Sequence, residues 1–321
     1  MIKNENQIKN SFNHQLITTI NIFSQPVTFL LILKDKRIAS SSADPTIKIF
    51  NDETYKIEII IKEHTNYVIY LTQLKDGRIV SSSSDCTIKI FTIYNSSYKT
   101  EQILTVHTKP VKKTILLENN FLASCSWDET INIWKENNNN LFNLYQTLPK
   151  KNINDAIFEI NLNEFFTLSH DQKEICFYKF NGNNYYFLTS IKNIVISGFP
   201  TNSIKINEDF FLVGGESEIF FININNHNIH FTYKINNNIF ETKWIQSFCL
   251  LNDKSLIVGI ESDLLHFKIN NTNLELINYL KNAHLDNEKD WKVISSITQK
   301  SNGDIITTSY NSNIKIWKKK L

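Results

Sequence analysis

The chain has 321 residues, of which 41% are hydrophobic and 12% aromatic, so it can form a packed core and is not expected to be disordered. Its 34 Lys and Arg against 32 Asp and Glu give a formal net charge of +2, which argues against a protein that binds nucleic acid or membranes mainly through charge. No stretch approaches ~18 uncharged apolar residues. We therefore expect neither a nucleic-acid partner nor a membrane span.

The four cysteines, Cys86, Cys125, Cys176 and Cys249, show no C-x-x-C spacing of a zinc or thiol redox site. We expect them to be packed thiols in a reducing compartment, the cytoplasm or the nucleus. The N-terminal stretch MIKNENQIKNSFNHQ lacks the apolar segment of a secretory signal. Residues 1–14 are therefore predicted to be a polar tail.

The first predicted strand, Gln15–Phe23 (QLITTINIF), follows this tail, and a unit of four strands comes after it. Val27–Leu33 is the first strand of the unit. The phrase RIASSSADPTIKIF, which ends at Phe50, contains a second strand, a tight turn at an acidic residue, and a third strand that alternates apolar and polar residues. Tyr55–Ile61 is the fourth strand, and the preceding Asn51-Asp52 suits a hairpin because Asn tolerates left-handed backbone conformations.

The same unit recurs along the rest of the chain. Its phrase returns as RIVSSSSDCTIKIF and FLASCSWDETINIW, and then in weaker copies; the later copies end at Phe91, Trp134, Tyr178, Ile222, Phe267 and Trp317. The turn positions of the seven copies are Asp44, Asp85, Asp128, Asp171, Glu216, Glu261 and Asn311. Their spacing of 41 to 50 residues is close to the ~40–45 residues of a four-stranded propeller blade, so we predict seven blades rather than six or eight.

The two ends of the chain are predicted to share the last blade. Only Lys318–Leu321 follow the seventh copy, which is too short for a fourth strand and is interpreted as a solvated basic tail. Pairing of Gln15–Phe23 into the seventh blade supplies the missing strand and removes an exposed sheet edge. The predicted fold is all-β: residues 15–321 form a single seven-bladed β-propeller of four-stranded antiparallel blades, and the N-terminal strand closes the ring by pairing into the last blade.

The repeated phrases resemble the repeats of the WD40 (WD-repeat) family, which tend to end in a D-x-T-I-K-I-W-like stretch. In that family a His near the start of the repeat, a Ser or Thr in the second strand, the turn Asp and the closing Trp form a hydrogen-bonded network within a blade. The residues that the resemblance assigns to this structural network are His107, Ser124 or Ser126, Asp128 and Trp134 in the third blade, and His64, Ser81 or Ser83 and Asp85 in the second. Phe91 replaces the Trp of the second blade and cannot donate a hydrogen bond, and His284 is the candidate His of the seventh. No subfamily is indicated.

The recurrence of Ser, His and Asp raises the question of a hydrolase triad. A catalytic nucleophile occurs once, in one special environment, whereas these residues return blade by blade. Ser169, His170 and Asp171 are consecutive, and neighbours along a strand point to opposite faces of a sheet. The sequence also lacks nucleotide-binding, zinc-protease and EF-hand motifs. We therefore predict a protein without catalytic activity, cofactor or metal.

The resemblance implies that partners bind at the rim formed by the turns between second and third strands and the turns that lead into first strands. The predicted partner-binding residues on this rim are Trp127, His170, Tyr310, Tyr67 and Trp244. Trp127 is the strongest candidate, because a Trp at a turn tip is hard to bury within its own blade; the alternative is a ring that lies flat over its own sheet edge. Trp291, in the long last connection, is either a lid on the channel or a core anchor.

These features predict a non-catalytic protein–protein interaction scaffold or adaptor, a monomeric propeller within a multiprotein complex. The resemblance leaves two alternatives open. One is a substrate receptor of a ubiquitin ligase, although such receptors commonly carry an Arg two residues after the W-D-like dipeptide that closes a repeat, where this chain has Lys135-Glu136-Asn137 after Trp134. The other is a cytosolic iron–sulphur assembly targeting factor, which has a layout comparable to His107–Leu148. The fold alone does not decide between these functions.

Overall fold

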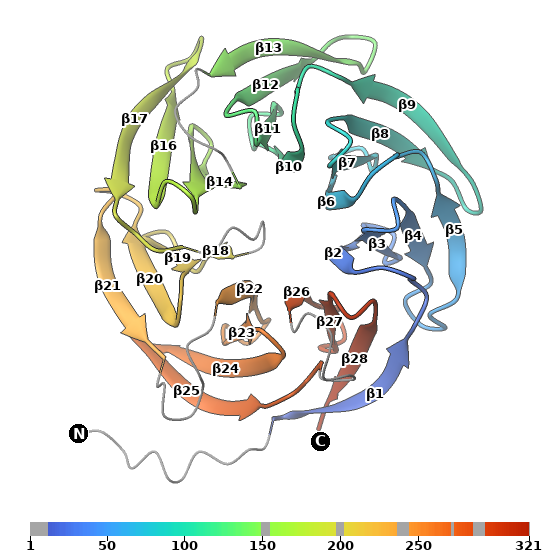
Figure 1. Cartoon of the computed structure of the whole chain (residues 1–321), viewed down its shortest axis with the longest axis vertical. Coiled ribbons are helices and arrows are strands. Elements are labelled where there is room, and N and C mark those ends of the chain that lie inside the picture. The colour runs from blue at the N-terminus through green and yellow to red at the C-terminus, as the bar shows by residue number, and fades with distance from the viewer. Residues whose placement is uncertain are drawn as a thin grey trace. The chain divides into compact units, whose positions relative to one another are not determined.

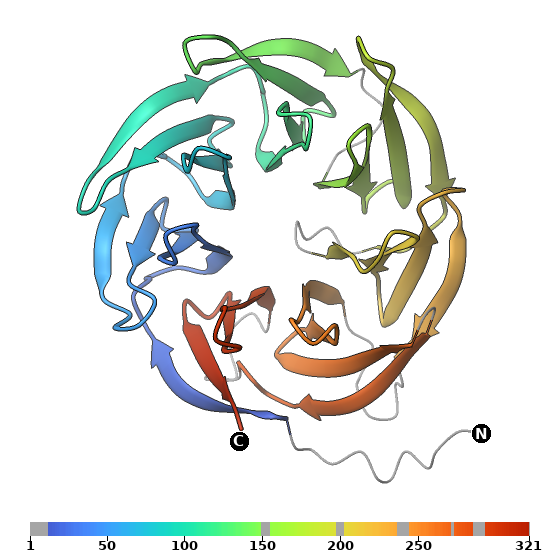
Figure 2. The same cartoon turned by 180° about the vertical axis from the view of Figure 1, so that it is seen from behind.

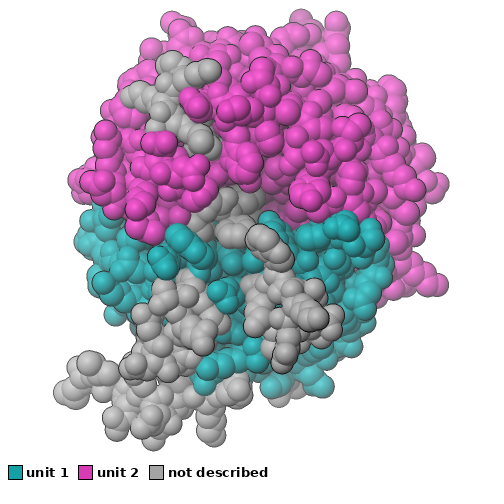
Figure 3. Space-filling view, in the orientation of Figure 1, with its two compact units in different colours: residues 1–27, 201–223, 229–321 teal, residues 28–200, 224–228 magenta. Residues whose placement is uncertain are grey.

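The computed structural model describes residues 12–148, 155–196, 202–235, 244–270, 273–284 and 293–320. The described residues form 28 β-strands in seven four-stranded antiparallel sheets and contain no helix, so none of them forms a helix that could cross a membrane (Figure 1). The chain divides into two compact units, which Figure 3 shows in different colours. Unit 1 contains residues 1–27, 201–223 and 229–321, and unit 2 contains residues 28–200 and 224–228.

Unit 2 contains four sheets whose strands pair in chain order. They are β2 (Val27–Ile32), β3 (Ile38–Ser42), β4 (Ile47–Phe50) and β5 (Ile57–Ile61); β6 (Val68–Gln73), β7 (Ile79–Ser83), β8 (Ile88–Ile93) and β9 (Tyr98–Leu104); β10 (Val111–Leu116), β11 (Leu122–Ser126), β12 (Ile131–Glu136) and β13 (Phe142–Leu148); and β14 (Ala156–Asn161), β15 (Glu164–Ser169), β16 (Glu174–Phe180) and β17 (Tyr185–Lys192). The predicted first strands of the first three repeats begin at the residues expected from the sequence.

Unit 1 contains three sheets, and the third combines strands from both ends of the chain. They are β18 (Ser203–Lys205), β19 (Phe210–Gly214), β20 (Glu218–Asn223) and β21 (Ile229–Lys234); β22 (Ile245–Leu250), β23 (Leu256–Ile260), β24 (Asp263–Asn270) and β25 (Asn273–Leu280); and β26 (Ile294–Gln299), β27 (Ile305–Ser309), β28 (Ile314–Lys319) and β1 (His14–Ile20). The order of the third sheet is β1-β28-β27-β26.

The pairing of β1 with β28 confirms the predicted role of the N-terminal strand. Register runs antiparallel from His14 opposite Lys319 to Ile20 opposite Ile314, and the two strands lie side by side in Figures 1 and 2. The lysines near the C-terminus are therefore not all in a tail, because Lys318 and Lys319 belong to β28. Of the predicted polar tail, the structure describes residues 12–14, and in these Phe12 and His14 are buried.

The second strand of each repeat is buried along its whole length and consists mainly of small or aliphatic residues. In unit 1 two of these strands carry glycine where the first strand of the next repeat packs closely. A Cβ at Gly214 would lie 2.6 Å from a side-chain carbon of Ile245 on β22. One at Gly259 would lie 3.2 Å from side-chain carbons of Ile294 on β26, and 2.4 Å from Oγ of Ser247 in its own sheet. Steric contact therefore explains why these weaker copies carry Gly in the second strand.

The turns between second and third strands hold their acidic residue by local hydrogen bonds. In the second repeat, Oδ1 of Asp85 accepts from the amide of Thr87 at 3.0 Å and from its hydroxyl at 2.6 Å. Between them Cys86 adopts a left-handed conformation with φ 70°, a geometry in which short polar side chains stabilise the turn. Asp128 and Thr130 repeat these contacts in the third repeat, with Glu129 at φ 69°. This turn places the second carboxylate oxygen toward the preceding loop.

Candidate functional site

In the sheet β10–β13 a continuous hydrogen-bonded network crosses the blade. The indole N–H of Trp134 donates to Oγ of Ser124 at 2.9 Å, and Ser124 lies 2.8 Å from Nε2 of His107. Nδ1 of His107 lies 2.9 Å from Oδ2 of Asp128. Because an ionised carboxylate can only accept, Nδ1 of His107 donates to Asp128, and Nε2 of a neutral ring then accepts from the Ser124 hydroxyl. Burial would by itself raise the pKa of the Asp128 carboxyl, but its hydrogen bonds with His107 and Thr130 hold that pKa below its usual range.

The sheet β6–β9 has the same network without its Trp. His64 lies 2.6 Å from Oγ of Ser81 through Nε2 and 2.8 Å from Oδ2 of Asp85 through Nδ1. The pKa of the Asp85 carboxyl is again lowered, since the hydrogen bonds of His64 and Thr87 outweigh the effect of burial. Phe91 at the Trp position is fully buried and supplies no donor.

These two sets of residues have the contacts of a Ser-His-Asp triad, but they are buried within their sheets and have a structural role. Ser81 and Ser124 are both 0% exposed within their sheets, so no substrate could reach the hydroxyl oxygens. The run at Ser169 differs, because His170 faces a carboxylate at each ring nitrogen, Asp155 and Asp171, and the Ser169 oxygen accepts from the amide of Gln172. Within the described residues, no group of three or more His, Cys, Asp or Glu side chains could hold a metal.

Unit 1 contains a third network, which includes its Trp, in the sheet that β1 completes. The indole N–H of Trp317 donates to the Thr307 hydroxyl at 2.8 Å, which lies 2.7 Å from Nε2 of His284. Nδ1 of His284 lies 2.7 Å from the side-chain oxygen of Asn313. The turn residue Asn311 instead donates to the backbone oxygen of His284 at 2.8 Å. The acceptor in this sheet is thus an amide two residues after the turn position.

Trp127 lies in the loop between β11 and β12 and is 39% exposed. Its indole N–H donates to Oδ1 of Asp155 at 2.9 Å, and Nζ of Lys112 lies 4.4 Å from the ring centroid. Burial lowers the pKa of Lys112, and the Asp155 carboxylate opposes that shift. The ring thus contacts Lys112 on β10, an edge strand of its own sheet, and also reaches the residue before β14 of the next repeat, while part of it remains exposed.

His170, in the loop between β15 and β16, is held by the same carboxylate. Its Nδ1 lies 3.0 Å from Oδ2 of Asp155, and its backbone N–H donates to that oxygen at 2.9 Å. The His170 side chain is 44% exposed, whereas Asp155 is 1% exposed. One buried carboxylate thus fixes two exposed rings from consecutive repeats. We call this surface, formed by Trp127 and His170 over Asp155 and Lys112, the Trp127–His170 surface.

The other three predicted rim residues have different surroundings. In unit 2, Tyr67 precedes β6 and is 52% exposed. In unit 1, Trp244 precedes β22, forms an isolated antiparallel β-bridge with Glu216 through the backbone, and is 37% exposed. Tyr310, also in unit 1, is half-buried, and burial raises the pKa of its hydroxyl to about 12. Trp291 lies outside the described residues.

Sequence reasoning did not identify Asp155 or Lys112 as part of a site. Asp155 stands directly before its repeat's first strand, as Tyr67 and Pro110 do in the two preceding repeats, so no shared residue type marks the position. The available signal was a carboxylate in the loop that faces the Trp127 turn of the preceding repeat. Lys112 is the second residue of β10, and nothing in the sequence distinguishes it from an exposed strand lysine.

Comparisons with known proteins agree with these observations. The family model described as "WD domain, G-beta repeat" matches residues 56–92 and 98–135. The chain is similar to the crystal structure of the WD40 β-propeller domain of Doa1, with a TM-score of 0.75 and 19% identity over 96% of this chain and 97% of that chain. It is also similar to the structure of U3-55K, with a TM-score of 0.76 and 15% identity over 94% of this chain and 98% of that chain. No curated protein sequence matches the chain.

Identities this low show a shared fold and no more. WD40 propeller domains generally mediate protein–protein interactions, and the fold typically serves as a non-catalytic interaction scaffold. Together with the seven four-stranded sheets and the pairing of β1 with β28, the matches confirm the predicted fold. The chain is a seven-bladed β-propeller, and the matched repeats and the similar structures support a WD-repeat family with no specific subfamily.

Proposed function

We propose that the chain is a non-catalytic scaffold that binds a protein partner through the Trp127–His170 surface. The observation that carries this proposal is the bond between the Trp127 indole N–H and Asp155. Because the polar atom of the ring already has a buried partner, the exposed part of the ring is apolar and held in place. A partner that covers it gains apolar contact without having to satisfy the N–H, and little side-chain entropy remains to be lost.

Three substitutions separate the contributions of the ring and of its support. Trp127→Ala removes the contact area, and we expect binding to weaken about thirtyfold, or ~2 kcal/mol, as at an interface hot spot. Trp127→Phe keeps a ring but removes the N–H donor, and Asp155→Asn keeps an acceptor but removes the charge. Both should weaken binding much less than Trp127→Ala does.

The partner is first identified by affinity capture from native cell extract with the wild-type chain, and binding of the purified partner is then measured by calorimetry. Circular dichroism of each variant establishes that it is folded. Wild-type affinity in a folded Trp127→Ala variant would contradict the proposal and move the binding surface elsewhere. The choice between a general adaptor, a ubiquitin-ligase receptor and an iron–sulphur targeting factor, and the expected cytoplasmic location, remain predictions that the partner's identity would test.

A further inference from the structure

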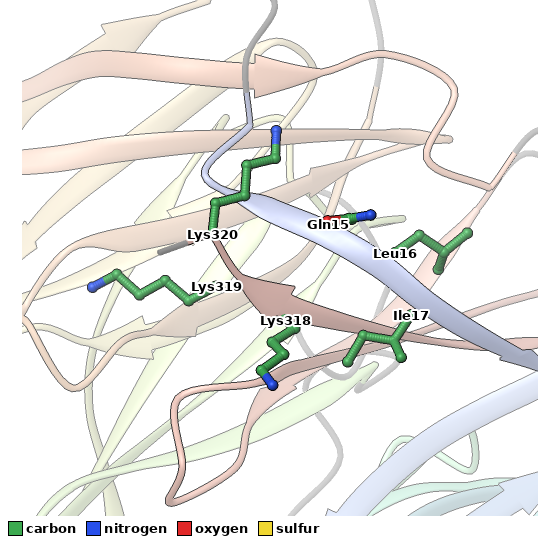
Figure 4. A pocket seen from close by; sticks show the side chains of 6 residues that line it. All are labelled: Gln15, Leu16, Ile17, Lys318, Lys319 and Lys320. Atoms are coloured by element: carbon green, nitrogen blue, oxygen red, sulfur yellow. The ribbon is translucent and has the colours of Figure 1, made fainter.

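A second surface, in unit 1, has a chemistry unlike that of the Trp127–His170 surface. A groove of about 520 Å³ lies along the paired strands β1 and β28, lined by Gln15, Leu16, Ile17, Lys318, Lys319 and Lys320 (Figure 4). Leu16 is 40% and Ile17 52% exposed, and the side chains of the three lysines are exposed. The groove therefore combines two exposed aliphatic residues with a dense positive charge.

A β-bulge produces the aliphatic exposure. Leu16 is opposite Trp317 and Thr18 is opposite Ile316, so Ile17 is an extra residue with no partner in β28. Lys318 is opposite Gln15, two residues before Ile17, and Lys318 and Ile17 leave the ribbons on the same side in Figure 4. One ligand in the groove can therefore contact both an apolar side chain and an ammonium group.

Within the described part of the chain, ion pairs do not neutralise the charges of the three lysines. None of the three forms an ion pair with a described carboxylate. Lys319 contributes to the lowered pKa of Asp253, so some of its charge is balanced at longer range. Three adjacent positive charges at the end of one strand repel one another, and a ligand with negative charges would relieve that repulsion.

The equivalent groove in unit 2 shows that the backbone does not require this charge. It lies along β12 and β13, has a volume of about 400 Å³, and has the same register, with Leu144 opposite Trp134 and the bulge residue Tyr145 beside it. Where three lysines follow Trp317, the residues after Trp134 are Lys135, Glu136 and Asn137. Tyr145 packs against Phe121 with 4.9 Å between ring centroids and its hydroxyl donates to the Asn183 backbone oxygen, so the side chain at this bulge already has partners within unit 2.

We propose that the β1–β28 groove binds an extended acidic segment of a partner protein, with carboxylates on the lysines and an aliphatic side chain over Ile17. Charge complementarity favours an acidic ligand, and the exposed Leu16 and Ile17 favour one that also carries apolar residues. Single-stranded nucleic acid fits less well because its binding sites usually offer aromatic rings for stacking, and this groove has none. The proposal does not depend on the Trp127–His170 surface.

The test uses the full chain and a fluorescein-labelled peptide in which every third residue is Leu and the others are Glu or Asp. Binding is followed by fluorescence anisotropy. The double variant Lys319→Glu/Lys320→Asn copies the Lys-Glu-Asn sequence that the fold already accepts after Trp134. We expect this variant to bind about tenfold more weakly and the wild-type affinity to fall severalfold as salt rises above physiological strength, because exposed charges are screened.

The matched control is Lys56→Glu/Lys62→Asn, which makes the same change in net charge beside β5, an outer strand with exposed Ile57 and Ile60. It should keep wild-type affinity. Ile17→Thr, at an exposed position, should weaken binding severalfold and tests the aliphatic contact independently. An equal loss in the control, no binding of the acidic peptide at low salt, or binding to phosphatidylserine vesicles but not to the peptide would each overturn the proposal.

Discussion

The sheet β10–β13 and the sheet formed by β26–β28 with β1 meet the same hydrogen-bonding requirement with different residues. Each has a closing Trp that donates to a hydroxyl, and each hydroxyl bonds a buried His. The His then bonds a carboxylate, Asp128, in the first sheet and an amide, Asn313, in the second. The network therefore requires a donor or acceptor at each position rather than one residue type, and only one of the two sheets has a charged group at its end.

The same two sheets also differ in how the chain supplies their fourth strand. β13 follows β12 after a short hairpin, whereas β1 and β28 are at opposite ends of the sequence. The first sheet can form from local chain, but the second is complete only when the N-terminal segment has paired. We expect the second sheet to be more sensitive to changes at the termini and to acid.

Deletion of residues 1–24 should have the largest effect. It removes β1 together with the buried Phe12, and leaves β28 with an unpaired edge. We expect aggregation, or a melting temperature lower by about 10 °C or more. Size-exclusion chromatography and calorimetry measure both outcomes. A stable monomeric fragment 25–321 would show that the pairing of β1 is dispensable.

Shorter deletions sharpen this prediction, because Phe12 belongs to the same hydrophobic cluster as Trp317. The two ring centroids are 6.2 Å apart, and Phe12 is 2% exposed. A chain that begins at residue 12 should melt like the full chain. Loss of Phe12 as well should cost about 3 kcal/mol, the usual effect of removing a buried Phe side chain. Equal stability of the two deletions would place Phe12 outside the core.

Acid should weaken the sheet that contains β1 before it affects the sheet β10–β13. Burial lowers the pKa of His14 to about 4, and the positive charges of His266 on β24 and Lys319 on β28 add to this, against the effects of the Gly303 backbone and Asp253. The folded chain thus binds this proton more weakly than the unfolded chain does. Stability that is complete above the ordinary His pKa of 6.5 is therefore lost as the pH falls toward about 4, by up to about 3 kcal/mol.

Substitution of His14 by Phe should remove most of this dependence. Urea midpoints of the wild-type chain and of His14→Phe, measured at pH values between about 7.5 and 4.5, should diverge as the pH falls. The Asp128 carboxyl has a lowered pKa, so its contribution is lost only below the ordinary Asp pKa and does not overlap with this range. Parallel pH profiles of the two chains would show that His14 is not the group responsible.

The sequence predicted the features that are determined by residues within one repeat, and it missed those that depend on contacts with a neighbouring repeat. The strand phrases follow from residue types at repeated positions, the roles of His64 and His107 from the resemblance to WD40 repeats, and the pairing of β1 from the missing fourth strand of the seventh repeat. Asp155 acts on side chains of two repeats, and its importance becomes visible only when the sheets are packed. His266 on β24 lies 2.7 Å from Oγ of Ser255, the residue before β23, a contact that no repeated residue type in the sequence indicates.

The smallest predicted losses of stability come from substitutions of the residues that bond Nδ1 of the network His, Asp128 in one sheet and Asn313 in the other. Asp128→Ala should cost about 1–3 kcal/mol, because it removes the carboxylate that bonds Nδ1 of His107 and that accepts from the amide of Thr108 at 3.0 Å in a buried environment. Asn313→Ala removes a neutral acceptor from His284 and should cost about 1 kcal/mol. Glu261→Ala, in the turn of β22–β25 where no such His network exists among the described side chains, should cost least.

Chemical denaturation of the three variants at neutral pH gives the ranking, and the acid range gives a second test. The difference between wild type and Asp128→Ala should shrink at low pH, since a protonated Asp128 no longer accepts as a carboxylate. The difference between wild type and Asn313→Ala should stay constant there, because an amide does not titrate. If Asn313→Ala or Glu261→Ala proved more costly than Asp128→Ala, the charged end of the network would not be what distinguishes the sheet β10–β13, and the stability of the blades would have to come from their apolar packing.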